Sequence, residues 1–324
     1  MPAGQPPALQ IEILGTETLG VRGLCCFVRT PERRILIDPG VALGYRRYGL
    51  LPHPLQVAVD ERVQEQILAR WGSATDILIS HFHGDHVPLR DANPYQLHLD
   101  DVVGSNPDVR VWVKPPDACS PLETQRASDL GSALAAELRA GSGRQEVMTF
   151  SPPVPHGESD REETVMMTRI EAGEVFVHAS DIQLLNDEAV SQILDWEPDI
   201  ALVGGPPLYL DRLAEEQVQR AWKNALRLAR GVDRLVLDHH LMRDREGLAW
   251  LDRLSGETGR PVMCAADFMG MPRRLLEADR QQLYEDMSVA PDWHQAYAEG
   301  GVDTDPYWRR ARGLYPELGL GPLR

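Results

Sequence analysis

The chain has few cysteines, and no apolar run is long enough to cross a membrane. Its four cysteines form no CxxC pair, and the adjacent Cys25 and Cys26 are poorly placed to bridge each other, which argues against a disulfide framework. The opening MPAGQPPALQ has neither the basic start nor the apolar stretch of a signal peptide. We therefore expect a reduced, cytoplasmic protein that does not insert into a membrane.

Basic residues are scarce relative to acidic ones. The 33 Lys and Arg residues stand against 49 Asp and Glu residues, which gives a formal net charge of −16. An acidic surface repels the phosphate backbone, so non-specific binding to nucleic acid is not expected. Bound metal ions would add positive charge that this count omits, and a small anionic substrate therefore remains compatible with the composition.

The first part of the chain predicts a sheet with a helix beside it. With 324 residues and 43% hydrophobic content, the chain can bury a large core. Short apolar runs at 9–14, 24–28 and 34–38 are separated by turn residues and predict a β-meander. A helical pattern at 60–71 then leads into a strand at 76–80.

Strands and helices alternate through the rest of the chain. We expect strands at 109–113, 146–150, 164–170, 174–178, 199–203, 234–237 and 262–265, and helices at 122–139, 213–230 and 244–255. The later strands are apolar enough to be buried on both faces, which favours sheets covered by helices. After about residue 268 the pattern gives way to an aromatic segment, which we expect to pack on the core or on a partner subunit of a homo-oligomer.

The motif SHFHGDH, which follows a predicted strand, offers four metal ligands in one short loop. His81 and His83 are two residues apart in extended chain, so both imidazoles project to one side. Gly84 permits a tight turn, after which Asp85 and His86 can be directed toward a second point nearby. One loop can therefore serve two metal ions.

Two metal ions need more ligands than this loop supplies, and later strand ends carry suitable side chains. His156, Asp181 and His239 each follow or lie beside a predicted strand, where their side chains can converge on one sheet edge. Together with the first motif they complete a set of seven candidate ligands.

These motifs, with ILIDPG around Asp38, resemble in order and spacing the five successive motifs of the metallo-β-lactamase superfamily over residues 10–265. The segments LGVRGLCCFV and LLEADRQQLYE are also similar to a little-characterised prokaryotic subgroup of predicted metallohydrolases. The resemblance implies an α/β protein with an αββα sandwich and a dinuclear metal site at one edge. We expect the catalytic domain over 8–268 and a C-terminal extension over 269–324.

The same resemblance assigns three ligands to each metal ion and one carboxylate to both. The first set is His81, His83 and His156, the second is Asp85, His86 and His239, and the shared carboxylate is Asp181. The expected cofactors are two divalent ions, Zn²⁺ in the first place, with Mn²⁺ or Fe²⁺ as alternatives.

Some neighbours of these ligands have two interpretations. His240 directly follows His239, and because alternate strand positions face opposite sides, we expect His239 to be the ligand. His178 is expected to lie within its strand, in the core or hydrogen-bonded to a ligand. Asp38 either turns the chain after its strand or accepts a hydrogen bond from a ligand histidine.

The predicted reaction is attack by a metal-bound hydroxide, because metal binding can lower the pKa of water from about 15.7 to near 7. Asp85 takes part as a ligand, and His240 or His53 is the predicted proton donor to the leaving group. His53 lies in a Pro-bounded loop, which is typical of a surface residue but also of a pocket wall.

For the substrate, a small phosphodiester or other phosphorylated compound is favoured, because two metal ions suit in-line displacement at phosphorus. A lactone, amide or thioester is the alternative hydrolytic substrate. Two further classes are an iron-dependent oxidoreductase of the same fold and a non-catalytic metal-binding scaffold.

Overall fold

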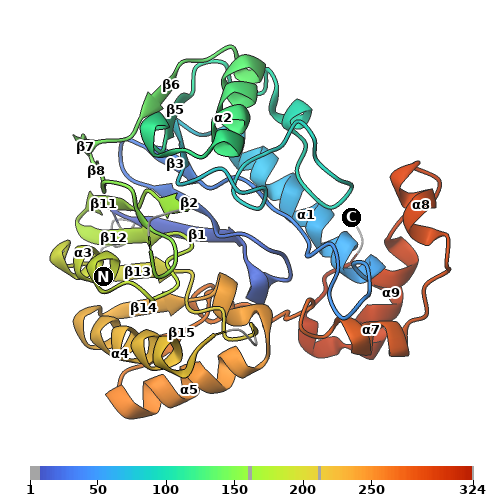
Figure 1. The fold of residues 1–324 in the computed structure, drawn as a ribbon. Helices are drawn as coiled ribbons and strands as arrows, with labels where there is room; N and C mark the ends of the chain where they lie inside the picture. The colour runs from blue at the N-terminus through green and yellow to red at the C-terminus, as the bar shows by residue number, and fades with distance from the viewer. Residues whose placement is uncertain (1–7, 160–162, 211–212, 323–324) are drawn as a thin grey trace, which may run out of the picture.

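Two β-sheets pack face to face between two layers of helices in the computed structural model, which describes residues 8–159, 163–210 and 213–322 (Figure 1). The first sheet has the strand order β1-β2-β3-β4-β5-β6. Its strands are β1 (Gln10–Gly15), β2 (Cys25–Arg29), β3 (Arg34–Ile37), β4 (Asp76–Ile79), β5 (Arg110–Val113) and β6 (Leu138–Ala140). Strands β1 to β3 are antiparallel neighbours, which confirms the predicted β-meander, and β3 to β6 are parallel.

The second sheet has the order β15-β14-β13-β12-β11-β8-β7. Its strands are β7 (Gly143–Gln145), β8 (Met148–Phe150), β11 (Thr168–Ala172), β12 (Glu174–Ala179), β13 (Ile200–Val203), β14 (Arg234–Leu237) and β15 (Val262–Met263). Strands β12 to β15 are parallel, as expected for strands joined by helices. A separate antiparallel pair, β9 (Val154–Pro155) and β10 (Thr164–Val165), lies between β8 and β11 in the sequence.

Helices cover the outer face of each sheet. They are α1 (Pro54–Trp71), α2 (Pro121–Leu134), α3 (Asp187–Asp195), α4 (Glu215–Gly231), α5 (Glu246–Thr258), α6 (Ala265–Phe268), α7 (Arg280–Asp286), α8 (Trp293–Ala298) and α9 (Asp305–Leu314). Figure 1 shows α1 and α2 on the first sheet, α3, α4 and α5 on the second, and α7 to α9 beside α1.

The alternation of side chains along β3 shows how the layers form. Ile35 and Ile37 enter the core between the two sheets, whereas Leu36 packs with the buried residues of α1. Because successive side chains in a strand point to opposite faces, one apolar strand contributes to two cores. The predicted αββα sandwich is confirmed.

Two helix boundaries differ from the sequence-based expectation. The helix expected at 60–71 begins earlier, at Pro54, because His53 caps it and proline fits its first turn. The helix expected at 122–139 ends at Leu134. The chain then turns into β6, which pairs with β5.

The strand expected at 164–170 is divided between β10 and β11, which pair with different partners. Met166 and Met167, between them, are fully buried. This break lets the chain leave the small β9–β10 pair and enter the second sheet.

The C-terminal segment packs on the helix layer of the first sheet. Trp293 and Trp308 are buried in the same core cluster as the apolar face of α1, and the guanidinium of Arg62 lies 3.5 Å from the Trp308 ring centroid. Contact with a partner subunit stays a prediction.

Among the described residues, no helix combines the length and apolar character needed to span a bilayer.

Candidate metal centre

The other six predicted ligands gather around the carboxylate of Asp181, which is only 1% exposed. Asp181 follows β12, the SHFHGDH motif follows β4, and His239 follows β14, so the cluster draws on both sheets. His156 directly follows β9. The ends of these strands meet at one edge of the sandwich, as the sequence predicted.

One oxygen of Asp181 faces the predicted second ligand set. The Nε2 atoms of His86 and His239 lie 3.0 Å and 3.1 Å from Asp181 Oδ1. Both nitrogens are also 3.8 Å from an oxygen of Asp85. Asp85, His86 and His239 form one group whose ligand atoms all lie within 4.8 Å of one another.

The other oxygen of Asp181 faces the predicted first set. The Nε2 atoms of His81 and His156 lie 3.5 Å and 3.2 Å from Asp181 Oδ2. His83 forms a group with His81 and Asp181 in which the ligand atoms lie within 4.8 Å of one another. The two oxygens of Asp181 therefore face different histidines, and its role as a bridging ligand stays a prediction.

His240 also reaches this carboxylate, with its Nε2 3.5 Å from Asp181 Oδ2. The expectation that His239 and His240 face opposite sides is wrong, because both lie in a short 3-10 helix, η4 (His239–Arg243), beyond the end of β14. His239 has a left-handed backbone with φ of 54°. The two rings are therefore only 4.3 Å apart and point to the same cluster.

Asp38 supports the histidines of the SHFHGDH motif on the side away from the cluster. It both turns the chain after its strand and contacts a ligand histidine, the two roles that the sequence left open. Its φ of 47° turns the chain after β3, and its Oδ2 lies 3.1 Å from His86 Nδ1. Ser80 Oγ donates to the same oxygen at 2.7 Å and lies 2.9 Å from His81 Nδ1. In this arrangement both Nδ1 atoms carry the proton, which leaves the Nε2 lone pairs of His81 and His86 directed at the cluster.

Two glutamates that the sequence did not single out support the other histidines. Glu17, in the 3-10 helix η1 (Glu17–Leu19), has an oxygen 2.9 Å from His239 Nδ1. Glu163 lies 3.4 Å from His83 Nε2 and 3.3 Å from His156 Nδ1. Glutamates are common in this chain, and only the folded arrangement distinguishes these two.

The buried carboxylates stay ionised, and their charges raise the pKa of His86 well above its usual range and the pKa values of His156 and His239 to about 9. Burial alone would raise the pKa of Asp181, but the imidazoles of His86 and His239 hold that pKa well below its usual range. Burial, with the neighbouring rings of His86 and His83, lowers the pKa of His81 to about 4. Metal ligands must be deprotonated to bind, so a bound cation would take the place of the protons on His86, His156 and His239.

Two observations indicate that the donor set fits divalent ions. The Nε2 atoms of His81 and His86 are buried and make no satisfactory hydrogen bond with any residue that the structure describes. Ligands 2.0–2.1 Å from a tetrahedral ion lie about 3.3 Å apart, and the imidazole nitrogens around Asp181 lie 3.0–3.5 Å from its oxygens.

Comparison with known proteins places the chain in a family. A UPF0282 protein of Methanosarcina mazei is 50% identical over 305 residues, covering 92% of this chain and 99% of that protein. A UPF0282 protein of Methanopyrus kandleri is 34% identical over 297 residues, covering 85% and 99%. The chain belongs to the UPF0282 family. No family model matches the sequence.

Similarity to solved structures is weaker. The isothiocyanate hydrolase from Delia radicum gut bacteria is 16% identical, with a TM-score of 0.47, covering 76% of this chain and 95% of its own. A metallo-β-lactamase mutant of Cronobacter sakazakii is 14% identical, with a TM-score of 0.36, covering 87% and 95%. Scores of this size do not indicate what the UPF0282 chain acts on.

Two further histidines of this UPF0282 chain serve the fold. His53 was a predicted proton donor or surface residue, and both expectations are wrong, because it is fully buried as the N-cap of α1. Its Nδ1 accepts a hydrogen bond from Leu55 N, and its Nε2 lies 2.9 Å from Met287 O, so both ring nitrogens are used. His178 is buried within β12, with its Nε2 2.9 Å from Leu24 O.

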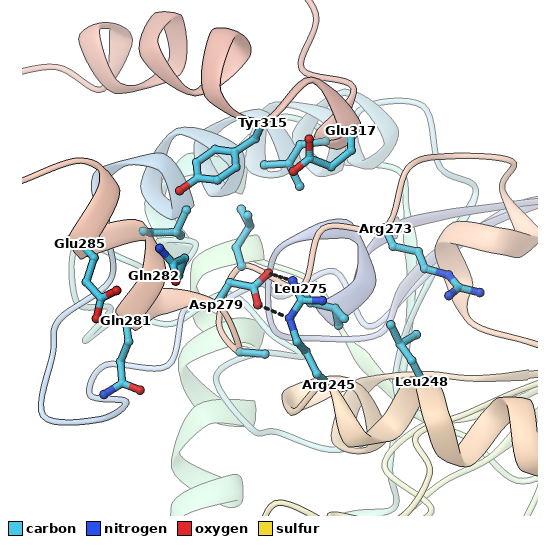
Figure 2. A pocket seen from close by; sticks show the side chains of 14 residues that line it. Arg245, Leu248, Arg273, Leu275, Asp279, Gln281, Gln282, Glu285, Tyr315 and Glu317 are labelled. Atoms are coloured by element: carbon cyan, nitrogen blue, oxygen red, sulfur yellow. Dashed lines mark hydrogen bonds and ion pairs between the residues drawn. The ribbon is translucent and has the colours of Figure 1, made fainter.

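A cavity of about 630 Å³ lies between α5, α7 and the C-terminal segment, and none of its lining residues belongs to the cluster (Figure 2). Its arginines are already paired. Arg245 Nε lies 2.6 Å from Asp279 Oδ1, as Figure 2 shows, and Arg273 Nε lies 2.8 Å from Asp267 Oδ1. We therefore place the candidate functional site of the UPF0282 chain at the cluster around Asp181.

Proposed function

We propose that this UPF0282 chain is a metal-dependent hydrolase with two metal ions. The observation that carries the proposal is the position of Asp181, whose two oxygens each face a separate set of imidazole nitrogens. A carboxylate in this position can bind one ion through each oxygen. The assignment as a hydrolase also rests on the resemblance of the motifs to the metallo-β-lactamase superfamily.

Two divalent ions bound here would act as Lewis acids and lower the pKa of a bound water from about 15.7 toward 7. The chain keeps the ligands in place through Asp38, Glu17 and Glu163, which contact the outward nitrogens of the histidines. Because those partners fix each ring, little reorganisation would be needed when an ion binds.

The exposure of the ligands indicates the side from which a substrate would approach. The side chains of His83, Asp85 and His156 are 33%, 18% and 12% exposed. Those of His81 and His86 are 2% exposed or less. A substrate would therefore reach the cluster over His83, Asp85 and His156.

A small phosphodiester or other phosphorylated compound is the substrate class that we favour. Two divalent ions carry four positive charges against the two carboxylates Asp85 and Asp181, so the loaded centre would attract anions. Arg243 lies at the edge of this centre, with Nη2 3.5 Å from Asp85 Oδ2, and its charge is paired with Glu17. Lactones, amides and thioesters form the alternative class.

We keep neither of the two histidines expected from the sequence as the proton donor to the leaving group. His53 has both ring nitrogens engaged within the fold. His240 Nε2 stands among the ligand atoms, 3.5 Å from Asp181 Oδ2.

Elemental analysis of purified variants tests the ligand assignment. We expect His81→Ala and Asp85→Asn each to lower the metal content per folded molecule, because each removes a donor from one set. His98→Ala is a matched control, since His98 is 40% exposed and contacts Asp100 instead of the cluster. Full metal occupancy in both ligand variants would contradict the proposed centre.

A hydrolysis screen tests the reaction. Wild-type protein loaded with zinc, manganese or iron would be offered phosphodiesters, lactones, thioesters and β-lactams in parallel. Turnover of phosphodiesters that is lost in Asp85→Asn supports the favoured class. Turnover of acyl substrates alone would replace that class with the alternative, and failure with every substrate in metal-loaded protein would count against a hydrolase.

A further inference from the structure

His240 is an additional histidine at the first metal position. Its Nε2 lies 3.5 Å from Asp181 Oδ2, the oxygen that His81 and His156 also approach. His156, Asp181 and His240 form a group whose ligand atoms all lie within 4.8 Å of one another. Four imidazoles and one carboxylate therefore surround this position once His83 is included.

The backbone directs His240 into the cluster. Asp238 precedes η4, and its Oδ1 accepts a hydrogen bond of 2.8 Å from His239 N and one of 2.7 Å from Thr16 Oγ1. These bonds fix the start of η4, and His240 is only 5% exposed. Its ring lies edge-on to that of His156, with the centroids 5.3 Å apart.

The Nδ1 atom of His240 does not hold the ring in place. It is buried and makes no hydrogen bond with any part of the chain that the structure describes. The outward nitrogens of His86 and His239, by contrast, lie beside Asp38 and Glu17. What favours His240 as a ligand is the position of its Nε2, which lies 3.5 Å from Asp181 Oδ2 among the other candidate donors.

We propose that His240 is a fifth protein ligand of the first metal, and that this five-donor set selects ferrous iron over zinc. The inference rests on the proposed metal binding and deepens it by naming the ion.

Coordination chemistry gives the reason for this selection. Catalytic zinc sites use three protein ligands and a tetrahedral geometry, whereas five donors suit a six-coordinate ion with one open position. Zinc binds most sites more tightly than ferrous iron, so selection for iron must come from geometry. Imidazole-rich sets suit iron, while manganese prefers oxygen ligands.

The spacing of the donors agrees with a wide site. His81 and His83 form one group with Asp181, and His156 and His240 form another. His81, His156 and His240 all approach the same oxygen, Asp181 Oδ2. The centroids of the His81 and His156 rings are 6.3 Å apart, which leaves room for donors all around a larger coordination sphere.

Cobalt(II) spectroscopy tests the coordination number without any need for activity. In an Asp85→Asn background, which weakens the second set, one equivalent of Co²⁺ should give the weak visible absorption of five- or six-coordinate cobalt. Adding His240→Ala should raise the absorbance per bound cobalt several-fold, toward the intense tetrahedral spectrum. His98→Ala in the same background is the control and should leave the spectrum unchanged, because the exposed His98 contacts Asp100 instead of the cluster.

The outcomes separate this inference from the proposed function. An intense tetrahedral spectrum in the His240-containing parent would overturn the inference while leaving metal binding intact, and this result needs no His240 variant to fold. Absence of cobalt binding in wild-type protein would overturn both.

Metal content gives an independent measure of selectivity. Wild-type protein and His240→Ala would be loaded anaerobically with equal iron and zinc, and the bound iron-to-zinc ratio determined. We expect the ratio to fall several-fold in the variant, and an unchanged ratio would overturn the selection.

Discussion

Glu17 offers a sharp test of how the second ligand set is supported. Its Oε2 lies 2.9 Å from His239 Nδ1, and its Oε1 accepts a hydrogen bond of 2.9 Å from Arg243 Nε. Glu17 is only 3% exposed, so these charged contacts are shielded from water. Glu17→Gln keeps the size of the side chain and removes its negative charge.

Two losses follow from the structure. Removing one partner of a buried ion pair costs about 3–5 kcal/mol, and the lower end applies because Asp85 Oδ2, 3.5 Å from Arg243 Nη2, still balances part of its charge. A loss of about 3 kcal/mol lowers the melting temperature by roughly 6 °C in a chain of this size. The oxygen partner of a ligand histidine also contributes about 10- to 100-fold in metal affinity.

The assay combines thermal unfolding with metal titration against a chelator. We expect the second ligand set to lose affinity for its ion and the first set to change little, because the side-chain hydrogen bonds of Glu17 go to His239 and Arg243. Glu216→Gln, at an exposed position in α4, is the control. Unchanged stability and unchanged metal affinity of the second ligand set in Glu17→Gln would refute the reasoning.

Two further predictions concern the fold. Burial lowers the pKa of His53 from 6.5 to about 4, so the neutral ring stabilises the protein above pH 6.5 and that contribution is lost as the pH falls toward 4. Between pH 7 and pH 5, the free energy of unfolding measured in urea should therefore fall by about 2 kcal/mol more in wild-type protein than in His53→Asn. Asparagine at this position keeps a residue that can cap the helix. Equal losses in the two proteins would contradict this prediction. Trp308→Ala should cost about 3–5 kcal/mol of stability while the metal content per folded molecule persists, and metal loss without destabilisation would show that the C-terminal segment completes the site.

The sequence predicted what depends on local pattern. The apolar runs predicted the strands. The spacing of His81, His83, Asp85 and His86 predicted a loop whose side chains are directed toward two metal positions. These signals are local, because strand alternation and a glycine turn determine where neighbouring side chains project. The cluster around Asp181 was predictable because parallel strands end at one edge.

Other features depend on distant parts of the chain and were not predictable in this way. His240 joins the cluster because the chain leaves β14 into a 3-10 helix, where strand alternation no longer applies. Glu17 reaches His239 only because the first hairpin and η4 come together in the fold. His53 has the pattern of a surface loop until the C-terminal segment covers it with Tyr284 and Tyr307.

The left-handed backbone at the cluster has a consequence for engineering this protein. Asp38, Asp181 and His239 all have φ between 47° and 57°, where a side chain costs roughly 1 kcal/mol relative to glycine. Glycine at these positions would relieve that strain, but it would also remove a ligand or its support. A search for thermostable variants that screens only for folding will therefore be drawn toward inactive sequences, and metal retention should be selected alongside stability.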